Sequence, residues 1–323
     1  MKLKVGIIGL GWFGNFHLDQ LLKMEEVEVV ALCAGNQEKL LLAHQKVPNA
    51  KCFNHHKEML ESIELDAVYV CVTPARHEDI EVLIAEKGIA MYIEKPIGLD
   101  LERVQYIEQV ILESKVIHSI GYQERYSDSV AMIKKWLMNE TPLLIEGKWL
   151  DKMPSALWWR KMATSGGQVI EQATHIIDMM RYLFGEISVV ASQGVKGCVV
   201  AEHYDVTDAS NTLLQFKSGL LGSLQCACYL EEGASSEIGL VIQGKSSKLE
   251  YSWGKGIRLT SQDKEVYYEL SESSHYRASC RFIEAVIQKD QSLILSDYSD
   301  ARKTLELTID ITEKMTITEV GGN

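Results

Sequence analysis

Lys95 is the first residue whose type and setting suggest chemistry. It follows the apolar run Ile89 to Ile93 and Glu94, and Pro96 comes directly after it. Because proline cannot continue a sheet ladder and restricts the residue before it, Lys95 should occupy an extended or turn conformation at the carboxyl end of a strand. Ligands bind at that edge of an open α/β sheet, where a cation can stabilise negative charge on a reacting oxygen. The alternative is a solvated Glu-Lys pair on a loop.

A glycine turn near the start of the chain is the second group with a chemical use. The apolar run Leu3 to Ile8 leads into Gly9-Leu10-Gly11-Trp12-Phe13-Gly14, after which apolar residues recur at roughly helical spacing. Between a strand and a helix, this spacing lets the backbone turn tightly, approach a pyrophosphate and pack helix against strand. The N–H groups at the start of the helix favour phosphate. The residues predicted to bind a dinucleotide here are Gly9, Gly11, Trp12, Phe13 and Gly14.

The segment after the second apolar run, Val27 to Cys33, bears on which dinucleotide is bound. A carboxylate for the ribose hydroxyls of NAD is expected about 20 residues past the glycine motif, but the chain reads AGNQEK from Ala34 onwards. No acid stands directly at the strand end, and Asn36 and Lys39 could contact a 2′-phosphate. The segment therefore favours NADP(H) over NAD. Glu38 is interpreted as a helix-start residue, with a ribose contact as the alternative.

The elements that position these residues alternate between strand and helix. Apolar runs at Asp66 to Val72 and Val116 to Ile120 are separated by stretches with helical spacing. This alternation predicts an α/β fold with a doubly wound parallel sheet. Thr73, Pro74 and His77 follow the first of these strands and are predicted to line the same edge as the glycine turn. For His77, helix capping or simple solvation is the alternative.

The order of four motifs resembles one known family. GLGWFG lies near the amino terminus, CVTPARH occupies 71–77, EKP occupies 94–96 and GYQERY occupies 121–126. In this order and spacing they resemble the oxidoreductases called Gfo/Idh/MocA, after glucose-fructose oxidoreductase, inositol dehydrogenase and a rhizopine catabolism protein. The resemblance implies NAD or NADP as cofactor and a Rossmann domain at residues 1–121. Lys95 is then a catalytic and cofactor-binding residue, and Glu94 positions Lys95 or the nicotinamide ribose.

After Gly121 the alternation of strand and helix stops. The remaining predicted helices are 130–137, 277–286 and 301–314, and the predicted strands are 213–216, 220–229, 238–243 and 266–270. This pattern resembles the family's second domain, so residues 122–323 are expected to form an α+β domain with a large, mainly antiparallel open sheet that binds substrate. The resemblance also implies a homodimer or homotetramer formed through this sheet. The last helix could pack back on the body of the protein.

The segment from Ser165 to Gly185 supplies the other catalytic candidates. Glu171 and His175 stand four residues apart, which places both side chains on one face of a helix, and Asp178 continues that face and could support the histidine. A helical histidine is more often structural than catalytic, but this position matches the family's Asp-x-x-x-His element, which implies that His175 is catalytic. Glu171 stands where the family commonly has aspartate, and Ala173 where it often has glycine. Glu171 is predicted to bond to a substrate hydroxyl or to His175, or to act in orientation alone.

Further substrate-binding candidates lie on both sides of that segment. Trp159 and Arg160 could offer an apolar platform and a cation to a sugar ring. The alternative for the tryptophans at 158 and 159 is packing between sheet and helix. Tyr122, Gln123 and Arg125 lie at the predicted domain junction and are candidate pocket residues, with a structural ion pair as the alternative role of Arg125.

Composition excludes several other classes of protein. The 323 residues include 33 Lys and Arg against 45 Asp and Glu, and the net charge of −12 opposes binding to nucleic acid or anionic membranes. The amino terminus has no signal-peptide pattern, and no apolar run of about 20 residues could cross a bilayer. Seven scattered cysteines suit a reducing cytoplasm better than a disulfide framework. No cysteine or histidine grouping has metal-ligand spacing, so no metal is expected.

Together these residues predict a cytoplasmic NAD(P)-dependent oxidoreductase that transfers hydride between nicotinamide and a carbinol carbon of a sugar, sugar acid or cyclitol. His175 would remove the hydroxyl proton during oxidation, and Lys95 would stabilise the alkoxide. One alternative is a regulatory protein of the same fold that binds dinucleotide and sugar without turnover, and such proteins are expected to lose the lysine or the histidine. Another alternative is reduction of an imine or a tetrapyrrole, against which the carboxylate and histidine argue.

Overall fold

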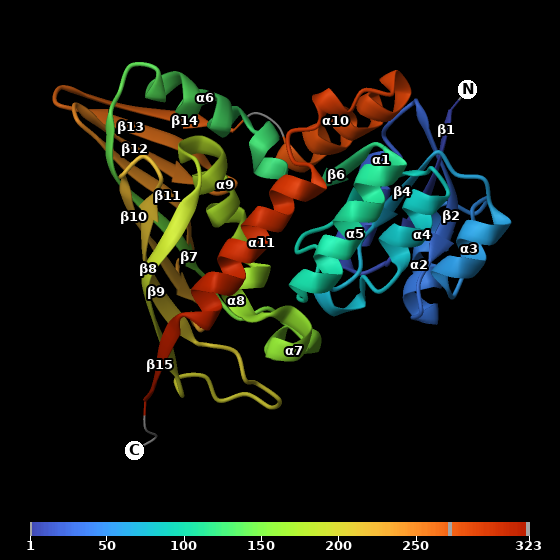
Figure 1. Ribbon diagram of the computed structural model, residues 1–323, viewed down its shortest axis with the longest axis horizontal. Helices are drawn as coiled ribbons and strands as arrows, with labels where there is room; N and C mark the ends of the chain where they lie inside the picture. The colour runs from blue at the N-terminus through green and yellow to red at the C-terminus, as the bar shows by residue number, and fades with distance from the viewer. Residues whose placement is uncertain (1, 271–272, 321–323) are drawn as a thin grey trace. The chain divides into compact units, whose positions relative to one another are not determined.

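The chain folds into two compact units. The computed structural model describes residues 2–270 and 273–320. The first unit consists of Met1–Gln123 and His275–Arg302, and the second of Glu124–Ser274 and Lys303–Asn323. Each unit has its own sheet (Figure 1).

The first unit is built on a six-stranded parallel sheet in the order β3-β2-β1-β4-β5-β6. Its strands are β1 (Leu3–Ile8), β2 (Val27–Cys33), β3 (Lys51–Phe53), β4 (Ala67–Val70), β5 (Ala90–Ile93) and β6 (His118–Ile120). Every residue of β4 and β5 is buried, as expected for central strands with helices on both faces of the sheet. The strand order reverses between β1 and β4, which is the switch point where ligands bind in such sheets. The predicted doubly wound parallel sheet is confirmed.

Six helices belong wholly or mainly to the first unit as the structure describes it. They are α1 (Trp12–Leu21), α2 (Gln37–Lys46), α3 (His56–Ser62), α4 (Ile80–Glu86), α5 (Leu101–Ser114) and α10 (Ser274–Gln288). Helix α5 begins where the Asp100 carboxylate accepts hydrogen bonds from two backbone N–H groups, and it ends at Lys115, whose φ of 55° is left-handed. Phe282 of α10 packs edge-on against Tyr69 and Tyr92, with ring centroids 5.6 Å apart in both cases. This packing places α10 against β4 and β5.

The second unit is built on a nine-stranded sheet in the order β14-β13-β12-β11-β7-β10-β9-β8-β15. Its strands are β7 (Pro142–Leu150), β8 (Ile187–Lys196), β9 (Ala209–Phe216), β10 (Leu221–Ala227), β11 (Glu237–Gly244), β12 (Ser247–Ser252), β13 (Gly256–Ser261), β14 (Lys264–Glu269) and β15 (Met315–Glu319). Only the β7–β10 and β8–β15 pairs are parallel, so the predicted mainly antiparallel sheet is confirmed. Strand β9 alternates buried and exposed side chains, as a sheet with one covered face requires.

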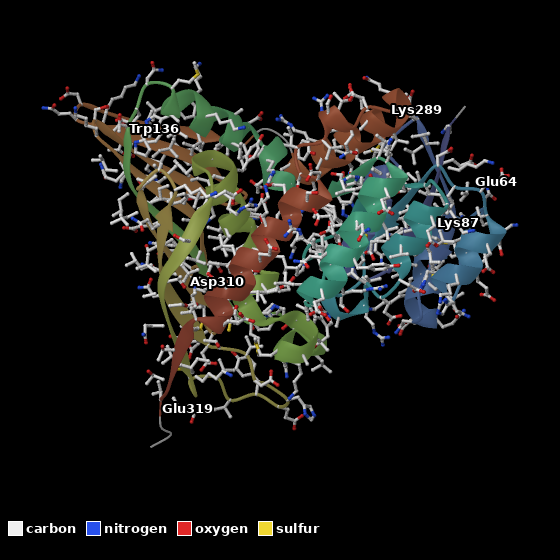
Figure 2. All side chains as sticks on the ribbon, in the orientation of Figure 1. Glu64, Lys87, Trp136, Lys289, Asp310 and Glu319 are labelled. Carbon is white, nitrogen blue, oxygen red and sulfur yellow. The ribbon has the colours of Figure 1, made fainter. Side chains whose placement is uncertain are left out.

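Helices cover the buried face of this second sheet (Figure 1). They are α6 (Asp128–Leu137), α7 (Met162–Ser165), α8 (Gly167–Glu171), α9 (Thr174–Phe184) and the larger part of α11 (Tyr298–Glu313). Ile176 and Met180 of α9 and Ile311 of α11 join the core that the sheet forms with its helices. Trp136 of α6, labelled in Figure 2, donates a hydrogen bond from Nε1 to Ser247 Oγ at 2.9 Å.

The predicted elements match the structure best where the sequence signal is local. Strands 3–8 and 27–33 have the predicted bounds, and the predicted hairpin at Lys217-Ser218-Gly219 joins the antiparallel strands β9 and β10. Strands β3, β7, β8, β12, β13 and β15 had no prediction.

Candidate active site

The glycine turn of the first unit has the geometry that a dinucleotide needs. Gly9 has a φ of 92°, and a Cβ there would overlap the backbone carbonyl of Cys71. A Cβ at Gly14 would overlap the carbonyl of Gly9, so helix and turn approach too closely for any side chain. A Cβ at Gly11 would meet no atom within 4 Å, and Gly11 is the N-cap of α1 without a side-chain hydrogen bond. The space beside Gly11 at the start of α1 is therefore open, which fits a phosphate bound at the helix N-terminus.

Asn36 and Lys39 lie just beyond the end of β2. Asn36 is the N-cap of α2, and its Oδ1 accepts a hydrogen bond from the Lys39 N–H at 2.9 Å. Glu38 lies in the first turn of α2, in agreement with its interpretation as a helix-start residue. Capping uses the Asn36 oxygen and leaves its amide NH₂ as a donor. Gly9 N–H donates to the Cys33 carbonyl at 2.9 Å, so this strand end lies beside the glycine turn.

Thr73, Pro74 and His77 follow β4 at the same edge of the sheet. A 3₁₀ turn at Pro74–Arg76 begins there, with Thr73 as its N-cap residue. His77 is buried; its Nδ1 lies 2.5 Å from Glu81 Oε1 and its Nε2 lies 3.1 Å from the carbonyl oxygen of Pro96. The solvated role considered for His77 is therefore wrong. The His77 side chain links Glu81 of α4 to Pro96, the residue that follows Lys95.

Glu94 and Lys95 lie directly after β5 and are both buried. Lys95 is 8% exposed, and its Nζ lies 6.0 Å from the ring centroid of Phe13 in the glycine turn. The solvated Glu-Lys pair considered as an alternative is therefore excluded. Burial alone raises the pKa of the Glu94 carboxyl group, but a hydrogen bond from His17 and the charge of Lys95 lower this pKa below its ordinary value. A carboxylate and an ammonium group thus stand next to each other beside the dinucleotide turn.

Two histidines of this site were not predicted from the sequence. His17 of α1 places Nε2 at 2.6 Å from Glu94 Oε1, and its ring is completely buried. His275 of α10 packs against Phe16 and Phe13 at centroid distances of 5.0 and 6.0 Å. Burial lowers the pKa of His275 to about 4, so its ring is neutral at pH 7. His17 follows the glycine motif by three residues, which is a usable signal, but its partner is distant in the chain.

In the second unit, the predicted helix through Glu171 and His175 is interrupted. Helix α8 ends at Glu171 and α9 starts at Thr174, so the two side chains do not share one helix face as the spacing predicted. The N–H of Ala173 donates to Gln168 instead of continuing the helical register. Glu171 Oε2 accepts a hydrogen bond from Trp159 Nε1 at 2.8 Å. Of the roles considered for Glu171, this contact fits orientation.

Asp178 shares helix α9 with His175, but its carboxylate is engaged by Arg125. Arg125 donates to both carboxylate oxygens of Asp178, at 2.8 Å from Nε and 2.5 Å from Nη2, and both side chains are buried. Thr304 Oγ1 adds a hydrogen bond of 3.1 Å to Asp178 Oδ1. Arg125 therefore makes the structural ion pair that was its alternative role.

His175 is buried and lies among aromatic side chains. Its ring stacks on Trp149 of β7 at a centroid distance of 5.8 Å and an interplanar angle of 18°. Trp253, which follows β12, meets His175 edge-on at 5.0 Å. Neither tryptophan was predicted, because strands β7 and β12 were not predicted and the pairing that brings them to His175 joins distant parts of the chain. These contacts fix the plane of the imidazole ring.

The remaining candidates are divided between the units. Tyr122 and Gln123 are buried residues at the end of β6 in the first unit. Trp159 is 1% exposed and packs with Val206 and Cys228, so the packing role considered for it is correct. Arg160 is half-buried, and its Nε has no hydrogen-bond partner among the described residues. Lys95 belongs to the first unit and His175 to the second.

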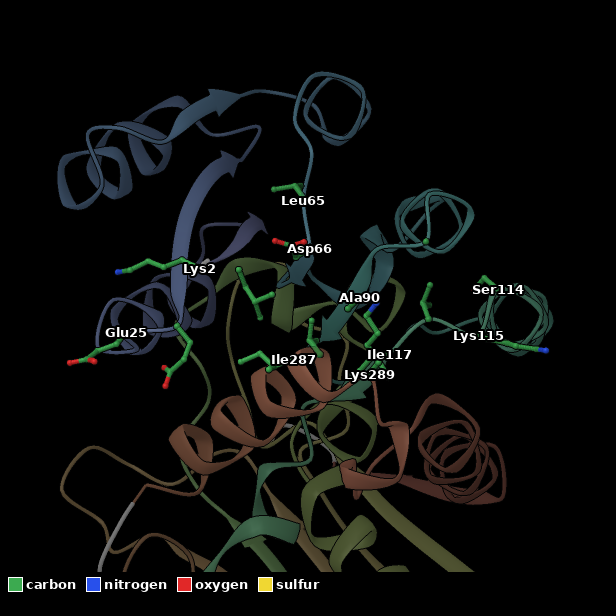
Figure 3. A pocket seen from close by; sticks show the side chains of 15 residues that line it. Lys2, Glu25, Leu65, Asp66, Ala90, Ser114, Lys115, Ile117, Ile287 and Lys289 are labelled. Atoms are coloured by element: carbon green, nitrogen blue, oxygen red, sulfur yellow. The ribbon is translucent and has the colours of Figure 1, made fainter.

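A cavity of about 920 Å³ opens on the first unit at the edge of the sheet where strands β4 and β5 begin. Leu65, Asp66 and Ala90, labelled in Figure 3, mark the starts of β4 and β5 there. None of the residues predicted to bind ligand lines this cavity. The candidate site lies instead at the carboxyl ends of the strands.

Two searches of the described residues bear on other functions. Within 2–270 and 273–320, no three His, Cys, Asp or Glu side chains are grouped so that they could hold a metal ion. Over the same ranges, no helix has the length and apolar character needed to span a membrane.

Family models match segments of both units, and two named relatives are similar to the chain. Residues 3–122 match a model described as an oxidoreductase family with an NAD-binding Rossmann fold, and residues 141–250 match the GFO/IDH/MocA C-terminal domain. A myo-inositol 2-dehydrogenase of Thermotoga maritima is 27% identical over 228 residues, which is 68% of this chain and 67% of the relative. A scyllo-inositol 2-dehydrogenase (NAD(+)) of Bacillus subtilis is 25% identical over 230 residues, or 70% of this chain and 67% of the relative.

A solved structure shares the whole fold. A levoglucosan dehydrogenase in complex with NADH superimposes with a TM-score of 0.86 over 97% of both chains, at 18% sequence identity. At that identity the likeness concerns the fold alone. The two family models together match more than half of the chain. The segment matched by the first model contains the glycine turn and the buried Glu-Lys pair described above. The chain therefore belongs to the Gfo/Idh/MocA family of NAD-binding oxidoreductases.

Proposed function

We propose that this chain is an NAD(P)-dependent dehydrogenase that acts on a carbinol carbon of a sugar, sugar acid or cyclitol. The observation that carries the proposal is the burial of Lys95 beside the glycine turn of the same unit, with its Nζ 6.0 Å from the Phe13 ring. A buried ammonium group beside a dinucleotide turn suits a substrate oxygen that gains negative charge. The relatives named as inositol 2-dehydrogenases support a cyclitol or a sugar as the class of substrate.

The cofactor would lie along the carboxyl ends of β1, β2 and β4. When bound, its nicotinamide would accept or supply the hydride. Gly9, Gly11 and Gly14 would shape the turn around the pyrophosphate, with Trp12 and Phe13 beside it and Thr73, Pro74 and His77 along the neighbouring strand end. The absence of a carboxylate between Ala34 and Asn36 supports a preference for NADP(H), with Asn36 and Lys39 as donors to the 2′-phosphate.

Lys95 and His175 divide the proton chemistry between the units. Lys95 would hydrogen-bond the reacting oxygen and stabilise the alkoxide, while His175 would take its proton in oxidation and return it in reduction. Glu171 would act on this centre indirectly, since its carboxylate accepts the Trp159 hydrogen bond at the end of α8. Tyr122, Gln123 and Arg160 are the proposed substrate contacts. Arg125 is engaged with Asp178 and would shape the pocket rather than bind substrate directly.

Single variants of the full chain test these roles. The assay follows reduction of NAD⁺ or NADP⁺ with myo-inositol, scyllo-inositol and levoglucosan as probes. Lys95→Ala and His175→Ala should each lower kcat by at least about 10²-fold, because each loses a group that acts on the transferred proton or the alkoxide. Asp19→Asn, which breaks an exposed ion pair with Lys46, is the control and should remain within a few-fold of the wild type.

Binding of the reduced cofactors, followed by nicotinamide fluorescence, separates chemistry from affinity. Both alanine variants should bind NADPH within a few-fold of the wild type, and the wild type should bind NADPH more tightly than NADH. Full turnover by either alanine variant would contradict the catalytic assignment. Tight cofactor binding by a wild type that oxidises none of the probes would favour the regulatory alternative instead.

The outer face of the second sheet supports assembly into a homodimer or homotetramer. Leu144, Leu213 and Leu221 are exposed on the neighbouring strands β7, β9 and β10. Light scattering of the purified chain measures the oligomeric state. A cytoplasmic location is supported by the cysteines, because all seven lie in the described ranges and all are free thiols.

A further inference from the structure

The buried carboxylate of Glu94 is held by a residue that the proposed mechanism does not use. His17 Nε2 lies 2.6 Å from Glu94 Oε1, and the side chains are 0% and 6% exposed respectively. Helix α1, which carries His17, starts at the glycine turn, and Glu94 directly follows β5. The contact therefore joins the phosphate end of the cofactor site to the strand end that presents Lys95.

The surroundings of the pair leave it little freedom. The His17 ring packs against Tyr69 and Tyr92, with centroid distances of 5.2 and 5.1 Å, and these two tyrosine rings stack on each other at 4.9 Å. On the other side, a Cβ added to Gly121 would come within 2.9 to 3.0 Å of three atoms of the Glu94 carboxylate. The carboxylate occupies the space that a side chain at position 121 would need. Packing therefore fixes both partners of the hydrogen bond.

The direction of the hydrogen bond follows from the partners of the imidazole. Nε2 faces a carboxylate, which only accepts, so Nε2 carries the proton. Nδ1 is buried and has no hydrogen-bond partner within the described part of the chain. A proton on Nδ1 would leave a buried N–H without an acceptor, which is unfavourable. His17 is thus suited to act as an N–H donor to an ionised Glu94.

The other ionisable groups near Glu94 do not replace this donor. Burial lowers the pKa of His275 to about 4, so that ring is neutral at pH 7. Burial, followed by the charge of Glu94, raises the pKa of the Cys71 thiol well above its ordinary value, so Cys71 stays protonated. The phenols of Tyr69 and Tyr92 belong to residues that pack against the His17 ring, and burial raises the pKa of Tyr69. Lys95 remains as the cation beside the carboxylate.

We propose that His17 and Glu94 are positioning residues: the hydrogen bond from His17 keeps Glu94 ionised beside Lys95 and fixes the glycine-turn helix against the end of β5. Without the N–H donor, burial would favour the neutral carboxylic acid. Lys95 would then lose the anion beside its ammonium group. The catalytic consequence rests on the proposed role of Lys95, whereas the ionisation of Glu94 does not.

The ionisation state of Glu94 can be measured directly. The full chain is labelled with ¹³C at the glutamate side-chain carboxyl carbon, and the Glu94 signal is assigned as the one lost in Glu94→Gln. Two His17 variants form a matched pair: His17→Gln keeps an N–H donor, and His17→Leu has none. At pH 7 the Glu94 signal should be that of a carboxylate in the wild type and in His17→Gln. In His17→Leu its titration should move upward by at least about one pH unit.

An unchanged Glu94 titration in His17→Leu would overturn the proposal. Circular dichroism checks that each variant is folded. If His17→Leu does not fold, Glu94→Asp provides the second test, because the shorter side chain moves the carboxylate away from His17 and its titration should also rise above the ordinary range for aspartate. An aspartate signal within that range would overturn the proposal equally.

Kinetics separate this inference from the proposed function. With myo-inositol, scyllo-inositol or levoglucosan as probe, His17→Leu should lower kcat about tenfold or more, leave cofactor affinity within about threefold, and be rescued by His17→Gln. If Lys95→Ala is inactive and the titration of the Glu94 signal is unchanged in His17→Leu, the positioning role is wrong and the proposed function stands. If the Glu94 signal responds but Lys95→Ala turns over fully, the function fails and the His17–Glu94 pair stands.

Discussion

Each unit buries a glutamate almost completely, and the two carboxyl groups respond in opposite ways. Glu94 of the first unit is 5% exposed and Glu124 of the second is 6% exposed. Burial raises the pKa of both, but at Glu94 the histidine donor and the neighbouring lysine lower it below the ordinary value. At Glu124 burial prevails and the pKa is raised, although hydroxyl groups of Tyr251 and Ser274 donate at 2.5 and 2.6 Å. Hydroxyl donors alone do not offset the desolvation of a carboxylate.

The opposite pKa shifts of Glu94 and Glu124 indicate where each unit accommodates a buried negative charge. The first unit retains an ionised carboxylate beside Lys95, at the edge of the sheet where the dinucleotide is expected. The second unit buries the carboxylate of Asp178 where Arg125 can donate two parallel hydrogen bonds. Under the proposed function, charge at Glu94 would serve a ligand, whereas charge at Asp178 serves the fold.

Breaking the Arg125–Asp178 pair should have the largest effect on stability. Asp178→Asn removes the anion of a buried ion pair, so the free energy of unfolding should fall by about 3–5 kcal/mol in urea titration. Combining Arg125→Met with Asp178→Leu removes both charges and should recover most of the loss. Asp19→Asn, which breaks an exposed pair with Lys46, is the control and should cost less than about 1 kcal/mol. If Asp178→Asn and Asp19→Asn lowered the free energy of unfolding equally, Asp178 would not be a structural anion.

The two glutamates should also give opposite dependences of stability on pH. Because the folded pKa of Glu94 is lowered, its charge stabilises the fold above the unfolded value near 4.5, and this contribution is lost as the pH falls through the folded pKa. The folded pKa of Glu124 is raised, so its contribution is greatest below pH 4.5 and declines as the pH rises through that higher value. A difference of one in pKa between the folded and unfolded states corresponds to about 1.4 kcal/mol in the free energy of unfolding.

Thermal unfolding between pH 3 and pH 8 checks this expectation. Relative to the wild type, Glu94→Gln should become more destabilising as the pH rises from 3 to 7. Glu124→Gln should become less destabilising over the same interval, or stabilising. Parallel curves for the two variants would remove the distinction between the units.

Sequence reasoning reached further in the first unit because its signals are local. The glycine turn, the apolar runs of β1 and β2, and Lys95 before a proline are each encoded within a few residues. The partner of Glu94 was missed because His17 lies 77 residues earlier in the chain. A helix residue one turn past a glycine motif gives no indication of the strand end that it will meet.

The second unit was harder to predict because distant contacts decide its local structure. The helix break after Glu171 has no glycine or proline to mark it. There, Gln168 donates to the Trp149 and Ala227 carbonyls at 3.2 and 2.6 Å, and Trp159 holds Glu171. The placement of Trp149 and Trp253 beside His175 likewise depends on strand pairing.

Substitutions of Asn36 should have the smallest effect on stability. They also test directly whether the end of β2 contacts the proposed cofactor. Asn36→Ala removes the N-cap of α2 and should lower the free energy of unfolding by about 1 kcal/mol. Asn36→Asp keeps an oxygen for the Lys39 N–H, so stability should be close to that of the wild type. Its new carboxylate stands at the end of β2, where it would repel a 2′-phosphate and accept ribose hydroxyls. NADPH affinity should therefore fall and NADH affinity rise in fluorescence titrations. If Asn36→Asp changed neither affinity, the end of β2 would not contact the adenosine ribose, and the proposed NADP(H) preference would lose its structural basis while the capping role remained.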